Sequence, residues 1–364
     1  AAITVNNTDG TCTANITNRT NRRLTINGDF RIAQRGTSST SNGYQTVDRW
    51  AAYSGDHGVT VTSSQQSTSS SDTPYQNGFS NFFRFALSGA GTANANAYFE
   101  LVQKIEAQDI ATSGWNFKSS SSSITLSFWV RASTNQTFYG FLKTYDGTPY
   151  IYAFSFTASG NNTWTKITKT IIGDSNLQFD NNNAQGLQIL LTPFYGTDYT
   201  NNRTLNTWTT VSTSNYFPDM ASTWLTAGAS TFDITGVQLE VGSVATDFEH
   251  RSFAQELALC QRYFRVFSSF SGIASAATSF QGPLSYDMRA TPSVALSPSG
   301  QARISDCSFS DFEASTVSAL NAYNATSTGL RISVAGFSGM SVQKPMVWLA
   351  TGTNQSDVHL SAEL

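Results

Sequence analysis

Cysteine and charge are both scarce in this sequence of 364 residues, which contains 3 cysteines and has 12% charged residues. Cys12, Cys260 and Cys307 are too few and too scattered for a disulfide framework or a zinc knuckle. Stability must therefore come from packing or from assembly of several copies. The net charge of -3 excludes a basic surface that would bind phosphates, so we expect no nucleic-acid partner.

Long apolar runs are also missing. None approaches the roughly 18 residues that a membrane-spanning helix needs. The first residues, AAITVNNTDGT, have neither the basic head nor the apolar core of a signal peptide. The sequence therefore predicts no membrane insertion and no export signal.

Residues with catalytic chemistry are few and stand in unrelated contexts. The histidines are His57, His250 and His359, and none has the spacing of a metal site or a nucleophile motif. A glycosidase needs two carboxylates about 5 to 10 Å apart. Candidates for that pair are Glu100, Glu106 and Asp109, which we interpret as solvated acids on or just after a strand. We expect no catalytic residues, no metal site and no enzyme activity.

Serine, threonine, asparagine and aromatic residues are abundant instead, with 25 Phe, 14 Tyr and 7 Trp. This composition favours strands over helices. Apolar runs between turn residues predict strands at Asn81–Leu87, Ala97–Glu106, Ile124–Ala132, Gln136–Leu142, Tyr150–Thr157 and Leu187–Thr192. The turns between them are short and contain no helical pattern. The fold class is therefore all-β, an antiparallel sandwich rather than a parallel α/β sheet.

A phase change marks the stretch FDITGVQLEV, Phe232 to Val241. Phe232 and Ile234 share one parity, whereas Val237 and Leu239 share the other. A bulge at Gly236 would insert one residue and return the apolar side chains to the inward face. We therefore predict one long strand with a bulge at this glycine.

The strongest helical pattern is SFAQELALCQRYFR, Ser252 to Arg265, which begins with a capping box formed by Ser252 and Gln255. Its apolar stripe consists of Phe253, Leu257, Cys260 and Phe264. A helix this short is marginal alone, so the stripe must be buried. It packs either on its own sandwich or against other copies around an axis, and the second arrangement predicts a homotrimer with these residues as the interface.

Exposed rings among neutral polar groups are what a sugar-binding surface requires. The stretch Thr192 to Trp224 is the longest aromatic and polar segment outside clear strands. Candidate glycan-binding residues are Tyr195, Tyr199, Trp208, Tyr216 and Trp224, together with Tyr286 and Trp348 further along the chain. The alternative is that these rings belong to a core or a subunit interface.

Four stretches resemble, in the same order, a family of bacteriophage tail fibre and receptor-binding proteins. They are LTINGDFRIAQRG, TVDRW, TLSFWVRA and FDITGVQLEVGSVATDFEHRSFAQELALCQRYF. The resemblance implies a galactose-binding-like jelly roll, as in carbohydrate-binding modules, followed by a tip domain, which YDMRATPSV and the terminal SAEL also resemble. The expected organisation is an N-terminal attachment segment (1–23), a jelly roll (24–250), a junction helix (251–267) and a small β-sandwich tip (268–364).

Modules of this type often hold a structural calcium ion with an NGDFE-like first strand and an Asp-rich last strand. Here Arg31 follows Phe30 in place of an acid, and Asp233 is the one carboxylate between residues 233 and 236. Calcium prefers several oxygen ligands, so this departure predicts that the fold is kept without its ion and without a cofactor.

The resemblance implies a virion fibre that attaches to host surface polysaccharide. We expect a homotrimer whose N-terminal segment binds a tail or baseplate adaptor protein, with the tip favoured as the receptor-binding part because it would lie farthest from that anchor. One alternative is a purely structural component, such as a head fibre or baseplate sleeve. Another is a capsule depolymerase, although the repeat of a long β-helix is missing.

Overall fold

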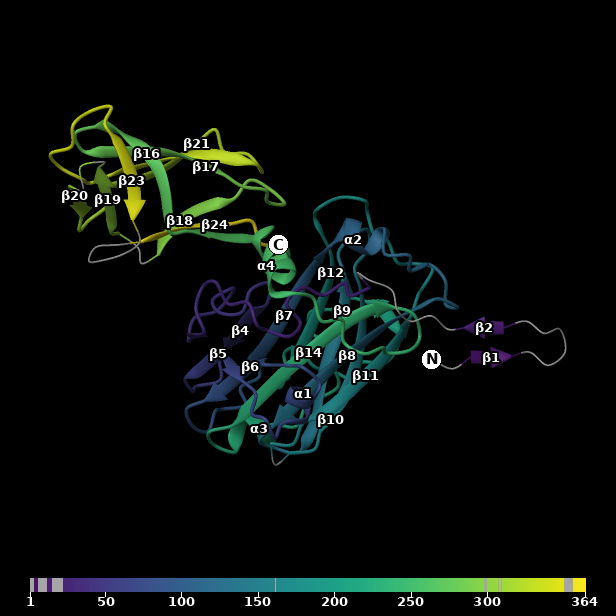
Figure 1. Ribbon diagram of the computed structural model, residues 1–364. Coiled ribbons are helices and arrows are strands. Elements are labelled where there is room, and N and C mark those ends of the chain that lie inside the picture. Colours follow the sequence, from purple (N-terminus) through teal and green to yellow (C-terminus); the bar gives the residue numbers. More distant parts are fainter. Residues whose placement is uncertain are drawn as a thin grey trace. The chain divides into compact units, whose positions relative to one another are not determined.

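The computed structural model describes residues 22–160, 162–297, 300–306, 308, 310–349 and 356–364, and the backbone of β1 (Ile3–Val5) and β2 (Cys12–Ala14). The chain divides into two compact units, Ala1–Ser252 with Leu364, and Phe253–Glu363 (Figure 1). Each unit has its own hydrophobic core. In the expected attachment segment, β1 and β2 form an antiparallel pair, and the remainder of residues 1–21 lies outside the described residues.

Two six-stranded antiparallel sheets build the larger unit, in the orders β13-β10-β9-β12-β7-β4 and β11-β8-β14-β6-β5-β3. The first sheet contains β4 (Ala51–Gly55), β7 (Tyr98–Glu106), β9 (Gln136–Thr144), β10 (Tyr150–Ala158), β12 (Gln185–Thr192) and β13 (Trp208–Thr210). The second contains β3 (Ser38–Ser39), β5 (Val61–Ser67), β6 (Asn81–Leu87), β8 (Ser123–Ala132), β11 (Thr165–Ile172) and β14 (Thr231–Val241). Successive strands often change sheet, and the predicted jelly-roll sandwich is confirmed.

Alternating side chains explain why these runs form strands. In β8, Ile124, Leu126, Phe128 and Val130 are fully buried in the core between the sheets. All six predicted strands are present within two residues of their expected ends. β11 lacks a clear apolar pattern in the sequence, because its lysines and threonines leave Ile167 and Ile171 as its inward apolar residues.

Three short helices lie between strands of this unit, α1 (Thr73–Gln76), α2 (Ala107–Ala111) and α3 (Thr223–Thr226). The NGDF and VDRW motifs are structural. Asn27 Nδ2 donates hydrogen bonds of 2.9 Å each to the carbonyls of Ile32 and Asp48, and Trp50 Nε1 donates to the Asn27 carbonyl at 3.1 Å. Asn27 and Trp50 are buried, so these motifs fasten the first segment of the domain to the sandwich.

The predicted bulge in β14 is confirmed. The register with β8 shifts between Thr235 and Gln238, and Gly236 has φ +64°. Phe232, Ile234, Val237 and Leu239 consequently all point into one core. A Cβ at Gly236 would lie 2.8 Å from Cζ of Phe79.

Gly236→Ala should therefore lower the free energy of unfolding by about 1 to 3 kcal/mol, because it adds both left-handed strain and a clash. Urea unfolding measures the change. The matched control is Gly89→Ala, whose added Cβ meets nothing within 4 Å; it should change stability by less than about 0.5 kcal/mol. Equal effects of the two substitutions would show that the bulge does not require glycine.

The smaller unit is the predicted second β-sandwich. After α4 (Phe253–Gln261), its strands are β15 (Phe264–Phe267), β16 (Ser269–Ala276), β17 (Ser279–Ser285), β18 (Ser293–Ser297), β19 (Ala302–Asp306), β20 (Asp311–Ala314), β21 (Ala319–Tyr323), β22 (Gly329–Ala335), β23 (Pro345–Leu349) and β24 (Asp357–Ser361). They form a three-stranded sheet, β15-β24-β18, and a seven-stranded sheet, β20-β19-β23-β16-β17-β22-β21. Side chains of both sheets share one core.

The helix is shorter than the expected Ser252–Arg265. It ends at Gln261, because Phe264–Phe267 pair with Val358–Ser361 of β24 and so become a strand. Cys260 and Phe264 are buried, whereas Leu257 is partly exposed and Phe253 is 57% exposed. Within one chain, the stripe is therefore buried only in its second half, and the Phe253 ring at its start is exposed. Among the described residues, no helix is long and apolar enough to cross a membrane.

Candidate functional site

A second, smaller hydrophobic cluster covers the outer face of the first sheet. Val102, Leu190 and Phe141 lie side by side on β7, β12 and β9. Buried Tyr195 and Phe217 pack on them from the connection between β12 and β14. This connection contains the aromatic and polar stretch singled out in the sequence.

An open pocket of about 340 Å³ adjoins this cluster, and five of its six lining residues are tyrosines. We call it the tyrosine pocket. It is lined by Tyr53 of β4, Tyr98 and Glu100 of β7, and Tyr195, Tyr199 and Tyr216 of the connection. Three predicted site residues, Tyr195, Tyr199 and Tyr216, thus meet in one pocket.

Backbone hydrogen bonds fix the connection against the sheet. Phe99 N–H donates to the Phe194 carbonyl at 3.0 Å, and Gly196 N–H donates to the Ala97 carbonyl at 2.8 Å. Further along, Tyr216 N–H donates to the Tyr199 carbonyl at 2.7 Å. The tyrosines therefore project from a paired backbone rather than from a free loop.

The rings that line the pocket differ in burial. Tyr195 is only 3% exposed and is the most buried of the five rings, with its centroid 5.3 Å from that of Tyr199. Tyr98 and Tyr199 stand at 84° to each other with centroids 6.2 Å apart. Tyr53, Tyr98, Tyr199 and Tyr216 are partly exposed, so parts of these rings are open to a ligand.

Glu100 supplies the only carboxylate among the residues that line the pocket. The Tyr195 hydroxyl donates a hydrogen bond to Oε1 of Glu100. Burial raises the pKa of Glu100, while this hydrogen bond and the charges of Lys143 and Lys104 act in the opposite direction. Burial and the neighbouring Glu100 hold the pKa of Tyr195 well above its ordinary value, so its hydroxyl remains a donor.

Tyr53, Tyr98 and Glu100 line the pocket but are not among the glycan-binding residues expected from the sequence. One signal was available, because Tyr98 and Glu100 alternate with the buried Phe99 and Leu101 and so share the outward face of β7. Nothing local indicated that this face would meet residues 195–216. That contact depends on pairing between distant segments.

The other predicted rings are inside the two cores. Trp224 is fully buried, its indole N–H donates to the Thr231 carbonyl at 2.9 Å, and its ring contacts Phe99 at 5.1 Å. Trp208 is 7% exposed and donates to the Ile172 carbonyl at 2.8 Å. Neither ring can stack on a ligand in this arrangement.

Both candidates in the smaller unit are also core residues. Trp348 is fully buried, stacked on Phe270 at 5.4 Å, and donates to the Ser356 carbonyl at 2.8 Å. Tyr286 is 6% exposed, and its hydroxyl donates to the Thr326 carbonyl at 3.1 Å. The structure therefore places these rings where packing, rather than stacking on a sugar, explains them.

The acids considered for glycoside hydrolysis do not gather at the pocket. Glu106 is fully buried at the start of α2 and accepts a hydrogen bond from Gln108 at 2.6 Å. It lies six positions beyond Glu100 on the same strand, or about 20 Å at roughly 3.3 Å per residue. Asp109 is exposed on α2. The pocket thus lacks the carboxylate pair that a glycosidase uses.

The residues considered for calcium form ion pairs. Asp29 lies 3.0 Å from Nε of Arg31, the residue that replaces an acid. Asp233 accepts from Nε of Arg84 at 2.7 Å and from Nε of Arg131 at 2.9 Å. Within the described residues there is no group of three His, Cys, Asp or Glu side chains that could hold a metal ion.

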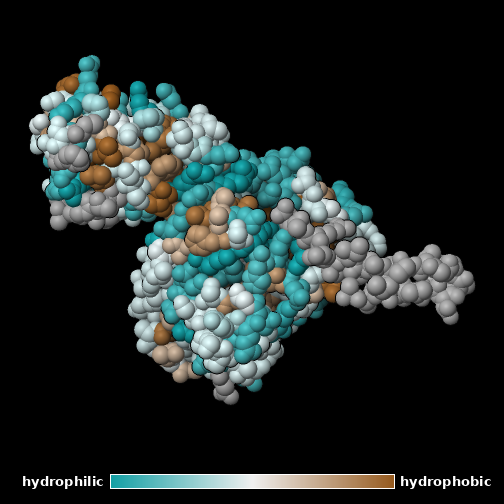
Figure 2. All heavy atoms as spheres, in the orientation of Figure 1, coloured by the Kyte–Doolittle hydropathy of each residue, from teal (hydrophilic) through white to brown (hydrophobic). Residues whose placement is uncertain are grey.

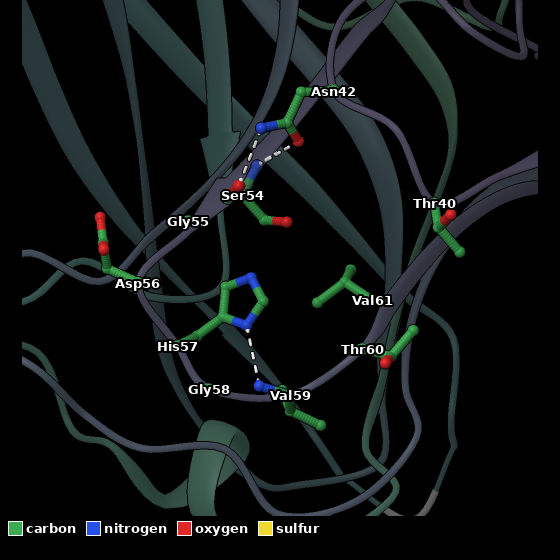
Figure 3. Close-up of a pocket in the computed structure, with 10 residues that line it drawn as sticks. All are labelled: Thr40, Asn42, Ser54, Gly55, Asp56, His57, Gly58, Val59, Thr60 and Val61. Carbon is green, nitrogen blue, oxygen red and sulfur yellow. Dashed lines mark hydrogen bonds between the residues drawn. The ribbon is translucent and has the colours of Figure 1, made fainter.

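A wider hollow of about 600 Å³ lies next to β4 and β5. Figure 3 shows the His57 imidazole facing Val61 across it, while the Asp56 carboxylate points away. His57 is buried and stacked on Phe99 at 4.7 Å, and burial lowers its pKa. The hollow offers hydroxyl and backbone groups but no exposed ring for stacking, so the tyrosine pocket is the better candidate for a glycan site.

Neither a family model nor a curated protein matches the sequence. Among solved structures, the chain is similar to the enzymatically active domain of tailspike protein 4 from bacteriophage CBA120, with 12% identity and a TM-score of 0.32 over 61% of this chain and 22% of that one. It is also similar to the family 11 carbohydrate-binding module of Clostridium thermocellum in complex with a β-1,3-1,4-mixed-linked tetrasaccharide, with 12% identity and a TM-score of 0.28 over 58% of this chain and 98% of that one. A third similar structure is a CBM4 module, with 14% identity and a TM-score of 0.32 over 59% and 98% of the two chains.

Proposed function

We propose that this protein is a phage fibre or receptor-binding protein of the virion, and that it binds host surface polysaccharide at the tyrosine pocket without cleaving it. The observation that carries the proposal is the convergence of five tyrosines and one carboxylate in one open pocket. Sugar rings stack on aromatic faces, and sugar hydroxyls exchange hydrogen bonds with phenol and carboxylate oxygens. This pocket offers both kinds of contact.

The composition of the chain favours recognition by stacking and hydrogen bonds. Only 12% of the residues are charged, and Figure 2 shows a visible face of the larger unit that is mainly hydrophilic or weakly polar with small apolar patches. Binding that depends on stacking and hydrogen bonds is screened little by salt. We expect a single pocket to bind with a dissociation constant near 1 mM, or about -4 kcal/mol.

Weak sites become useful when several act together through effective concentration. We therefore propose that the chain works as a homotrimer, held on the virion through its N-terminal segment by a tail or baseplate adaptor. The exposed Phe253 of α4 supplies apolar surface for contact between copies. Light scattering tests this part, since a 39.4 kDa particle at micromolar concentration would contradict it.

Binding without cleavage is tested with purified protein and host polysaccharide. In co-sedimentation, the fraction of protein that pellets with the polysaccharide should change little between low and moderate salt. A reducing-sugar assay should show no release of sugar. Release of sugar would favour the capsule depolymerase. Failure to bind host cells or polysaccharide would favour the purely structural virion component.

Loss of one pocket ring should weaken binding measurably. Tyr199→Ala removes a ring that contacts both Tyr98 and Tyr195, and we expect a 3- to 10-fold loss of affinity, since one aromatic contact is worth about 0.5 to 1.5 kcal/mol. The control is Tyr323→Ala, at a tyrosine of β21 that is 42% exposed. Affinity electrophoresis on host polysaccharide should separate the two variants, and equal losses would remove the pocket from the binding site.

A further inference from the structure

The lining of the tyrosine pocket also suits a ligand that carries a positive charge. It contains five aromatic rings and one carboxylate, and no lysine or arginine is among its lining residues. The face of an aromatic ring carries negative charge density and attracts a cation placed within about 6 Å of its centroid. A carboxylate beside such rings adds to the same attraction.

The rings are also arranged as a corner. The planes of Tyr98 and Tyr199 are nearly perpendicular, at 84°, and the buried Tyr195 ring packs against both, with its centroid 6.5 Å from that of Tyr98 and 5.3 Å from that of Tyr199. Aromatic cages of this form recognise quaternary ammonium groups, because perpendicular rings present several faces to one compact cation. The volume of about 340 Å³ exceeds that of one ammonium group, which leaves room for the sugar or alcohol that carries it.

The same sheet face already contains one contact of this kind. Lys143 of β9 places its ammonium group 4.8 Å from the centroid of the Tyr145 ring. The positive charges of Lys143 and Lys104 favour the ionised form of Glu100 and so lower its pKa, yet neither lysine lines the pocket. An anionic sugar in the pocket would therefore meet Glu100 without a cationic side chain among the lining residues to offset the repulsion.

We propose that the tyrosine pocket binds an ammonium group carried by the surface glycan, such as a choline or amino substituent, with the rings enclosing the cation and Glu100 as its counter-charge. This inference rests on the proposed glycan-binding function of the pocket and narrows it to one class of ligand. Tyr195 holds Oε1 of Glu100, and Oε2 accepts no hydrogen bond from the described residues. In this proposal Oε2 is the oxygen that pairs with the bound cation.

Choline chloride and 3,3-dimethyl-1-butanol provide the test, because the alcohol replaces the quaternary nitrogen with carbon and keeps the shape. Titration of the full chain, followed by calorimetry or tyrosine fluorescence, should show choline binding at least 10-fold more tightly than the alcohol. Glu100→Gln should reduce choline affinity about 10-fold and leave the alcohol unchanged. Glu313→Gln, in β20 of the smaller unit, is the matched control and should change neither.

The pH dependence has a definite sign. Burial raises the pKa of Glu100, and below that pKa the carboxyl is neutral. Choline affinity should therefore fall as the pH is lowered through it, whereas affinity for the neutral alcohol should not. The same pH series on Glu100→Gln should be flat.

Each outcome has a distinct meaning. Equal affinity for choline and the alcohol would overturn the inference, since shape alone would then explain binding. Binding of host polysaccharide without any binding of choline or of a primary-amine sugar would also overturn it, while leaving the proposed function intact. Failure of both polysaccharide and choline to bind would remove the proposed function as well. The comparison of the two probes uses the unmodified protein, so it does not depend on whether Glu100→Gln folds.

Discussion

Replacing Gly196 with valine is expected to abolish detectable polysaccharide binding while the sandwich remains folded. A Cβ at this position would lie 2.2 Å from the carbonyl oxygen of Asn94 and 2.3 Å from that of Ala95. These are backbone atoms, which cannot rotate away as a side chain can. The segment that carries Tyr195 and Tyr199 would have to separate from residues 94–97, just before β7, and two rings of the pocket would be displaced.

The measurement is binding to host polysaccharide alongside a thermal unfolding curve. Gly89→Val is the control, because a Cβ at Gly89 has no neighbour within 4 Å; it should keep full binding. Retention of binding by Gly196→Val would mean that the segment around Tyr195 is not part of the recognition surface.

Removing the carboxylate of Asp233 should produce the largest loss of stability, about 3 to 5 kcal/mol in the free energy of unfolding. The Asp233 side chain is fully buried and accepts hydrogen bonds from Arg84 and Arg131 at 2.7 to 2.9 Å. Asp233→Ala leaves two guanidinium groups without this partner in a poorly solvated place. Arg131 would keep its contact with Asp72 at 3.2 Å, whereas Arg84 would lose its ion-pair partner.

Urea unfolding of the full chain measures this loss in the transition of the larger unit. Asp180→Ala serves as the comparison, because Asp180 is exposed; surface changes of this kind are usually within about 0.5 kcal/mol. A loss below about 1 kcal/mol for Asp233→Ala would show that neighbouring groups or water replace the carboxylate.

The sandwich was predictable because the pattern of apolar and polar residues within each strand specifies it. Alternation in β8 and the parity change at Gly236 specify which side chains point inward, whatever the rest of the chain does. The end of α4 was not predictable in this way. Phe264 continues the helical stripe in sequence, but pairing with β24 about a hundred residues later makes it a strand residue.

The candidate site was predictable in part. Composition identified the aromatic stretch, and its residues Tyr195, Tyr199 and Tyr216 do meet in the tyrosine pocket. Composition could not distinguish them from Trp224, because a ring is equally suited to a core or a ligand. The tyrosines differ from Trp224 because their segment lies on the outer face of the first sheet. Hydrogen bonds of Phe194 and Gly196 with Phe99 and Ala97 hold the segment there.

The small cluster on the outer face of the first sheet is distinct from the main core of the larger unit. Tyr195, Tyr199 and Tyr216 belong to or pack on this outer cluster, so substitutions at the pocket should cost the sandwich less than substitutions in the main core. If the pocket binds surface glycans as proposed, substitutions there would alter which glycans are recognised before they alter whether the protein folds. Under that proposal, a lineage of such proteins could follow a changing host through substitutions at the pocket while keeping the same scaffold.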